Sequence, residues 1–162
     1  MAVPLPEDAS KSSSPNTRSP HSAEEARQSG YVGPLAGKTV VIVEDEGVTL
    51  LQLRRTLTHA GLKVVGMAGN GLEAVEMVLR ERPDLVLMDV QMPVMNGMEA
   101  ARRIREAYAV CIVMLTAFST EEYQQQAREA GACGYVLKPI TGAMLLPQLE
   151  TACRQFALSN SA

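Results

Sequence analysis

Short apolar runs alternate with amphipathic segments through most of this chain. The runs are rich in Val, Ile and Leu and show no polar alternation, which is typical of strands buried on both faces of a parallel sheet. They cover residues 39–43, 62–68, 84–89, 110–115 and 134–137. The run at 84–89 is the clearest, because four apolar residues end abruptly in the carboxylate of Asp89.

Each apolar run is followed by a segment with helical spacing of its apolar residues. The first helix is predicted over about 47–60 and stops at Gly61, the second closes before Pro83, and the third covers about 98–108. Ser119 and Glu122 form a capping-box pattern for a fourth helix that ends near Gly131. A fifth covers about 141–156, with first turns kinked or irregular at Pro147. The alternation predicts a doubly wound α/β domain, a five-stranded parallel sheet with helices on both faces.

The two ends of the chain differ from this pattern. Residues 1–37 combine several prolines with a serine-rich, mixed-charge sequence without periodicity, so we predict a disordered tail that includes a solvated His21. The folded domain is expected at 38–156, and residues 157–162 form a short C-terminal tail. Six polar or small residues after Phe156 leave no room for an output domain, so we expect a stand-alone unit or the front part of a longer protein.

Composition narrows the choice of function. A length of 162 residues favours one domain, and the formal charge of −3 shows no broad basic footprint for nucleic acid. Three cysteines without CxxC spacing, Cys111, Cys133 and Cys153, are expected to be buried free thiols in a reducing compartment. No run approaches the ~20 apolar residues of a membrane span, and the N-terminus lacks a secretory pattern. A cytoplasmic protein without membrane contact is therefore expected.

Polar residues follow four of the predicted strands. Glu44 and Asp45 follow the first, Asp89 ends the third, Thr116 the fourth, and Lys138 the fifth. A parallel sheet brings these strand ends to one edge, where open α/β sheets place their ligands. Each residue alone has a structural explanation, such as a helix cap, a turn or a solvated lysine. The convergence of all five is much harder to explain in that way.

Three neighbouring carboxylates repel one another, so the cluster needs a counter-ion. An all-oxygen site with few protein ligands suits Mg2+, and the absence of His and Cys from these motifs argues against zinc. Magnesium beside a free carboxylate and a lysine is suited to phosphoryl transfer onto an aspartate, with Asp89 as the attacking group.

These residues resemble the receiver domain of two-component response regulators over about 38–156. The resemblance is carried by Glu44-Asp45, by Asp89 followed by Met92-Pro93 and Gly97, by Thr116-Ala117, and by Tyr135 with Lys138-Pro139. It implies a flavodoxin-like sheet of strand order 2-1-3-4-5.

The resemblance also implies a phosphorylation site. Asp89 would be the phosphoacceptor, and the metal ligands would be Glu44, Asp45, Asp89 and the backbone carbonyl of Gln91. The phosphoryl donor would be a sensor histidine kinase or a phosphotransfer protein. Lys138 would pair with the phosphoryl group, before a Pro139 whose peptide bond is usually cis.

The same resemblance implies a switch. Thr116 would turn its hydroxyl toward the phosphoryl group, Tyr135 would swing inward with it, and Ala117 would leave room. The surface formed by the fourth helix, the fifth strand and the fifth helix would then meet a downstream protein, and a homodimer formed on phosphorylation is a further partner to consider. The pathway and the cognate kinase cannot be inferred from the sequence.

Two positions bear on how the site would behave. Many family members carry Asp where this chain has Glu44, so we expect weaker or altered metal binding. Phe118 and Gln91 occupy the variable positions that tune phosphoryl lifetime in the family, and a bulky Phe118 could shield the group from water.

Three other functions compete with the phosphoacceptor switch. A hydrolase of the haloacid dehalogenase type would need an Asp where this chain has Gln91, so an enzyme is not expected. A phosphorylation-independent binding module is the second. The stretch 145–156 also resembles receivers of transcription-antitermination regulators. The third alternative is therefore the front part of a longer RNA-binding regulator, although direct nucleic-acid binding by this chain is not expected.

Overall fold

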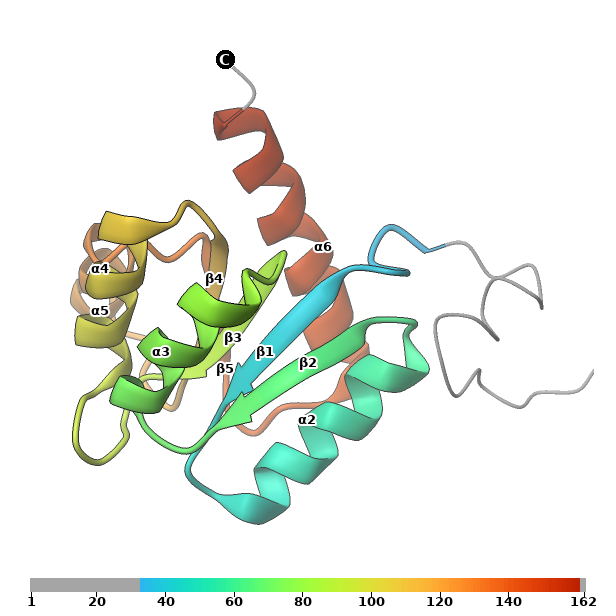
Figure 1. Ribbon diagram of the computed structural model, residues 1–162, viewed down its shortest axis with the longest axis horizontal. Coiled ribbons are helices and arrows are strands. Elements are labelled where there is room, and N and C mark those ends of the chain that lie inside the picture. Colours follow the sequence, from blue (N-terminus) through green and yellow to red (C-terminus); the bar gives the residue numbers. More distant parts are fainter. Residues whose placement is uncertain (1–32, 161–162) are drawn as a thin grey trace, which may run out of the picture.

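The computed structural model describes residues 33–160, which form one five-stranded sheet (Figure 1). All neighbouring strands are parallel, in the order β2-β1-β3-β4-β5. The strands are β1 (Thr39–Val43), β2 (Lys63–Ala68), β3 (Leu85–Asp89), β4 (Cys111–Thr116) and β5 (Gly134–Leu137). The predicted fold class and strand order are confirmed.

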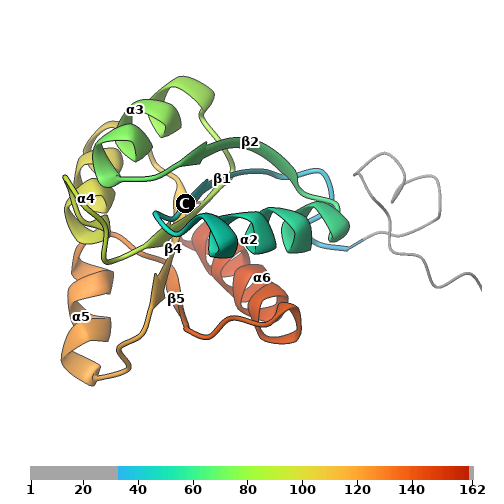
Figure 2. The ribbon, with the colours of Figure 1, turned by 90° about the horizontal axis from the view of Figure 1, so that it is seen from below.

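The helices cover both faces of this sheet. They are α2 (Gly47–His59), α3 (Gly71–Glu81), α4 (Gly97–Ala107), α5 (Glu121–Glu129) and α6 (Gly142–Ser159). Helices α3, α4 and α5 lie on one side, and α2 and α6 lie on the other (Figure 2). Within residues 33–160, none of the helices combines the length and apolarity needed to cross a bilayer.

The continuous apolar runs contribute side chains to a separate core on each face of the sheet. Val86 and Met88 of β3 pack toward α3, α4 and α5, whereas Leu85 and Leu87 pack toward α2 and α6. All five residues of β3 are buried. Truncating one of its large side chains to alanine would cost about 2–5 kcal/mol. This rigid central strand holds Asp89 at its carboxyl end.

Four of the five helices have an N-cap side chain that accepts a hydrogen bond. Asn70, Asn96, Thr120 and Thr141 each accept a hydrogen bond from the backbone N–H three residues later. The predicted cap at Ser119 is wrong by one residue, because Thr120 Oγ1 accepts from Tyr123 N. Two adjacent hydroxyl residues offer equivalent caps, and the packing of Tyr123 and Ala127 against the core selects between them.

Helix α6 includes Pro147, as the sequence predicted, and the neighbouring Leu145 and Leu149 are fully buried and hold it against the sheet. Other details differ from the sequence prediction. Helix α6 extends to Ser159, into the predicted C-terminal tail. Residues 34–37 form a turn that buries Leu35, so the ordered region begins before residue 38. The rest of the predicted N-terminal tail, with His21, lies outside the described residues.

Helix α4 starts in direct contact with the end of β3. The backbone N–H of Gly97 donates to the carbonyl of Val90 at 2.7 Å. A Cβ at Gly97 would lie 2.3 Å from the carbonyl oxygen of Asp89. Only glycine therefore lets the helix begin so close to the strand that carries Asp89.

We expect Gly97→Ala to lower the free energy of unfolding by about 1–3 kcal/mol, because the backbone must shift to admit the methyl group. Urea denaturation would measure this loss. Gly47→Ala is the matched control, because a Cβ added at Gly47 would have nothing within 4 Å. This control should leave stability unchanged or raise it by up to ~1 kcal/mol. Equal stability of the two variants would contradict the close-contact argument.

Candidate functional site

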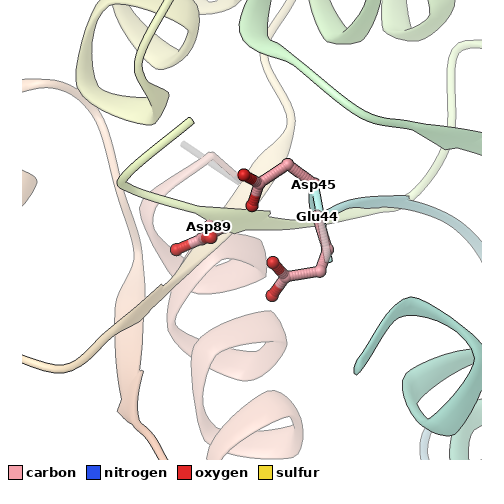
Figure 3. A group of neighbouring side chains, drawn as sticks. All are labelled: Glu44, Asp45 and Asp89. Carbon is pink, nitrogen blue, oxygen red and sulfur yellow. The ribbon is translucent and has the colours of Figure 1, made fainter. Parts of the chain in front are cut away.

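Three carboxylates converge where β1 and β3 end. Glu44 and Asp45 directly follow β1, and Asp89 is the last residue of β3. Figure 3 shows the three side chains extending to the same side of these strand ends. One carboxylate oxygen from each lies within 4.8 Å of the others. These residues line a cavity of about 260 Å³ that also contains Glu46, Val90, Gln91, Thr116, Ala117 and Lys138.

Lys138 joins two of the carboxylates. Its Nζ lies 3.0 Å from Glu44 Oε1 and 3.3 Å from Asp89 Oδ2. Lys138 follows β5, its backbone N–H donates to the carbonyl of Thr116 at 2.8 Å, and its bond to Pro139 is cis. The two strands next to β3 on either side, β1 and β4, thus supply Glu44 and Thr116, and the edge strand β5 supplies the cation.

Glu44 is the most deeply buried acid of the cluster, with 1% of its surface exposed. Burial raises its pKa to about 7, against hydrogen bonds from Lys138 and from the backbone N–H of Glu46 that lower it. The charge of Asp89 raises this pKa further. Negative charge at this position is therefore costly unless a cation shares the site.

Lys138 keeps its charge despite being partly enclosed. Burial acts to lower its pKa, but the hydrogen bond to Glu44 and the charge of Asp89 together raise it above the ordinary value. The lysine is thus a fixed positive group at neutral pH. Asp45, by contrast, is exposed and forms no ion pair among residues 33–160.

Asp89 and Thr116 are both nearly buried, each with 5% of its surface exposed. Asp89 Oδ1 accepts a hydrogen bond from Gln91 N at 3.3 Å. Thr116 Oγ1 accepts one from Phe118 N at 3.0 Å. Because the threonine oxygen acts as an acceptor in this bond, its own hydrogen stays available to a further acceptor.

The donor set fits a magnesium ion. All three ligand side chains offer oxygen, the preferred ligand of Mg2+, and no nitrogen or sulfur ligand competes. In an octahedral site with bonds of about 2.0–2.1 Å, ligand oxygens lie roughly 3–4 Å apart. Carboxylate oxygens within 4.8 Å of one another need only small movements, or one bridging water, to meet this geometry.

The remaining predicted residues occupy different positions. Gln91 and Ala117 line the cavity with the acids. Phe118 is 41% exposed, and its ring lies 4.9 Å from that of Tyr123 between centroids. Tyr135 is half-buried in β5 against the α3–α4–α5 core, and lines a second cavity next to α6.

The family model for the response regulator receiver domain matches residues 40–150. The chain belongs to this family. The resemblance found in the sequence is thereby confirmed. Receiver domains bind Mg2+ at an acidic pocket, and this chain has an acidic cluster of Glu44, Asp45 and Asp89.

Two curated relatives of this receiver domain are transcriptional regulatory proteins. It is 42% identical over 119 residues to the transcriptional regulatory protein PdtaR of Mycobacterium tuberculosis, covering 74% of this chain and 58% of that protein. It is 37% identical over 119 residues to the transcriptional regulatory protein CusR of Escherichia coli, covering 73% and 52%. The chain thus spans little more than half the length of either relative.

A solved structure shows the same fold. A chain of the CheX–CheY–BeF3–Mg2+ complex from Borrelia burgdorferi superposes with a TM-score of 0.68 and 27% identity, covering 70% of this chain and 87% of that chain.

Sequence reasoning missed a bond that recurs at three strand ends of this receiver domain. Glu44, Asp89 and Thr116 each accept, through a side-chain oxygen, the backbone N–H of the residue two positions later. Such bonds are local and common for Asp and Thr, so the polar residue at each strand end was a usable signal. They orient the three side chains before any ligand is bound.

The raised pKa of Glu44 predicts a pH-dependent stability in the absence of metal. The folded chain holds the Glu44 proton more tightly than the unfolded chain, so this contribution is complete below about pH 4.5 and is lost as pH rises through about 7. Glu44→Gln removes this contribution. The free energy of unfolding of the variant, relative to that of the parent, should therefore rise by on the order of 2 kcal/mol from about pH 5 to about pH 8. Denaturation in EDTA at both pH values would measure the gain. Glu73→Gln changes an exposed glutamate of α3, and its stability should depend on pH as that of the parent does. The same pH dependence in Glu44→Gln would contradict the role of the Glu44 proton.

Proposed function

We propose that this receiver domain is a phosphoacceptor switch in which Asp89 takes a phosphoryl group from a histidine kinase or a phosphotransfer protein. The observation that carries the proposal is Lys138 Nζ bridging Glu44 and Asp89 at 3.0 and 3.3 Å. This bridge places a positive charge beside the attacking carboxylate, next to an all-oxygen site. Family membership supports the same function.

Glu44, Asp45, Asp89 and the backbone carbonyl of Gln91 would hold Mg2+, the metal that the related Borrelia complex contains. When bound, the ion supplies positive charge that offsets the negative charge of the transferring phosphoryl group. Glu44 has one more methylene than Asp, so its contact with the ion is direct only if the side chain folds back. Weaker metal affinity than in receivers with Asp there is the expected consequence.

The transfer itself uses the nucleophile Asp89. A carboxylate oxygen attacks phosphorus in line, a new O–P bond forms, and the N–P bond of a phosphohistidine donor breaks. The imidazole leaves with the electron pair and gains a proton. Lys138 then pairs with a phosphoryl oxygen, and Thr116 donates its free hydroxyl hydrogen to another.

The conformational change would pass from the site to β4, which ends at Thr116, and to β5, which directly precedes Lys138. Tyr135 lies in β5, half-buried and open to the cavity beside Met144 and Gln148 of α6. A change at Thr116 would be accompanied by inward movement of Tyr135 and repacking of the surface formed by α5, β5 and α6. A downstream protein, or a second copy of the chain, would bind this surface.

Asp89→Asn should abolish phosphorylation, because an amide cannot attack phosphorus. The parent is incubated with acetyl phosphate and Mg2+, and intact mass should show one added phosphoryl group, absent with EDTA. Asp84→Asn is the matched control at the opposite end of β3, where Asp84 accepts hydrogen bonds from Thr39. It should be phosphorylated like the parent.

Other outcomes of this experiment identify the competing functions. No adduct in the parent would favour a phosphorylation-independent binding module. Multiple turnover of phosphate esters would favour a hydrolase. Phosphorylation that persists in Asp89→Asn would assign the phosphoacceptor to another residue. RNA binding belongs to the alternative of a longer antitermination regulator, and a filter-binding assay with the longer protein would test it.

Phe118 should protect the phosphoryl group from water. It follows Ala117 at the rim of the cavity and is supported by the ring of Tyr123. Phe118→Ala should dephosphorylate several-fold faster than the parent, measured by the decay of the phosphorylated mass after removal of the donor. Phe118→Leu, which keeps most of the bulk, should stay near the parent. A rate for Phe118→Ala no faster than the parent would contradict shielding.

A further inference from the structure

A cluster of three thiols lies near the amino ends of the strands, at the opposite end of the sheet from Asp89. Cys111 is the first residue of β4, Cys133 directly precedes β5, and Cys153 lies in α6. All three are free and belong to the core between the sheet, α2 and α6. The phosphoacceptor site uses none of them.

Cys111 and Cys133 are close enough to be joined. The backbone N–H of Cys133 donates to the carbonyl of Ile112 at 2.7 Å, so the two chain segments lie side by side. Both side chains belong to the same core on the α2–α6 side of the sheet. Neighbouring strands lie about 4.8 Å apart and rise about 3.3 Å per residue, so a one-residue offset would put the two Cα atoms roughly 6 Å apart, within the disulfide range.

The two thiols differ in access and in charge environment. Cys111 is buried, with 1% of its surface exposed, whereas Cys133 is half-buried and lines a cavity of about 250 Å³. Arg105 and Arg128 line the same cavity. Arg105 donates to the carbonyl of Val110 at 3.2 Å, lies 5.8 Å from the centroid of the Phe156 ring and forms no ion pair with a carboxylate among residues 33–160.

These surroundings assign different chemistry to each sulfur. The hydrogen bond with Cys111 lowers the pKa of Cys133 to about 6 against the effect of burial, assisted by Ile112 N–H and the charge of Arg105. The hydrogen bonds with Cys133 and Cys153, together with burial, raise the pKa of Cys111. The pKa of Cys133 thus lies below that of Cys111, so Cys133 is the more readily ionised thiol of this pair.

We propose that Cys133 and Cys111 form an oxidation site, in which Cys133 reacts with a hydroperoxide and Cys111 closes a disulfide between β4 and β5. It is independent of the proposed phosphorylation. Access through the cavity, the neighbouring guanidinium and the adjacent second thiol are what such a site requires.

The chemistry proceeds in two steps. The Cys133 thiolate attacks one oxygen of the hydroperoxide, an S–O bond forms, the O–O bond breaks, and the leaving alkoxide or hydroxide takes a proton from water. The sulfur of Cys111 then attacks that of Cys133, an S–S bond forms, and the S–O bond breaks. The departing oxygen leaves as water with the Cys111 proton. The two thiols lose two electrons in total, which reduce the peroxide.

The test treats the full chain with hydrogen peroxide, alkylates the remaining thiols and maps the peptides by mass spectrometry. The expected product has lost two hydrogens, keeps one alkylated thiol at Cys153, and contains a peptide that joins Cys111 to Cys133. Cys153→Ser should form the same link. In Cys111→Ser, dimedone should trap a sulfenic acid at Cys133. A link between Cys111 and Cys153, or three alkylated thiols after treatment, would overturn the proposal.

A pair of arginine variants tests the role of charge. Arg105→Gln should slow alkylation of Cys133 by iodoacetamide at neutral pH several-fold, because less thiolate is present. Arg128→Gln removes the other guanidinium of the cavity and should leave the rate near that of the parent. Circular dichroism would confirm that both variants are folded. Equal rates in the two variants would overturn the activation of Cys133 by Arg105.

Discussion

The ion-pair bridge of Lys138 to Glu44 and Asp89 is the interaction on which the acidic edge of the sheet depends. Two carboxylates, 1% and 5% exposed, lie beside each other, and Lys138 is the cation in ion-pair contact with them. Breaking such a buried pair by removing one partner leaves an uncompensated charge, at a cost of several kcal/mol. Burial raises the pKa of Glu44, and the charge of Asp89 adds to this rise, because one lysine balances only one of two negative charges. A divalent cation would complete the balance.

The sheet makes this charge cluster possible. Strand β3 is buried throughout, with a separate core on each face, so its end is held rigidly. Backbone N–H groups two residues beyond Glu44, Asp89 and Thr116 then orient the three side chains. The functional groups are therefore positioned mostly by strand ends and local backbone bonds. The proposed phosphoryl transfer would therefore need little side-chain reorganisation beforehand, which is the general advantage of preorganised sites.

Strands β4 and β5 run between the two sites. Strand β4 begins at Cys111 and ends at Thr116, and β5 lies between Cys133 and Lys138 in the sequence. A covalent link between the thiols would restrain the same pair of strands through which a phosphorylation signal is proposed to leave. The two sites share a structural element but use unrelated chemistry.

The sequence by itself determined the fold class, the strand order through family resemblance, and which polar residues follow each strand, because unbroken apolar runs and breaks at Gly and Pro are local signals. It misplaced the cap of α5 by one residue, since Ser119 and Thr120 are equivalent locally and only packing selects Thr120. It treated the cysteines as unrelated buried thiols, although the pairing of β4 with β5 brings Cys133 beside Cys111. Tertiary structure alone decided that Lys138, 94 residues from Glu44, neutralises it, and that burial raises the pKa of that glutamate, because distances and desolvation arise only when distant strands pack together.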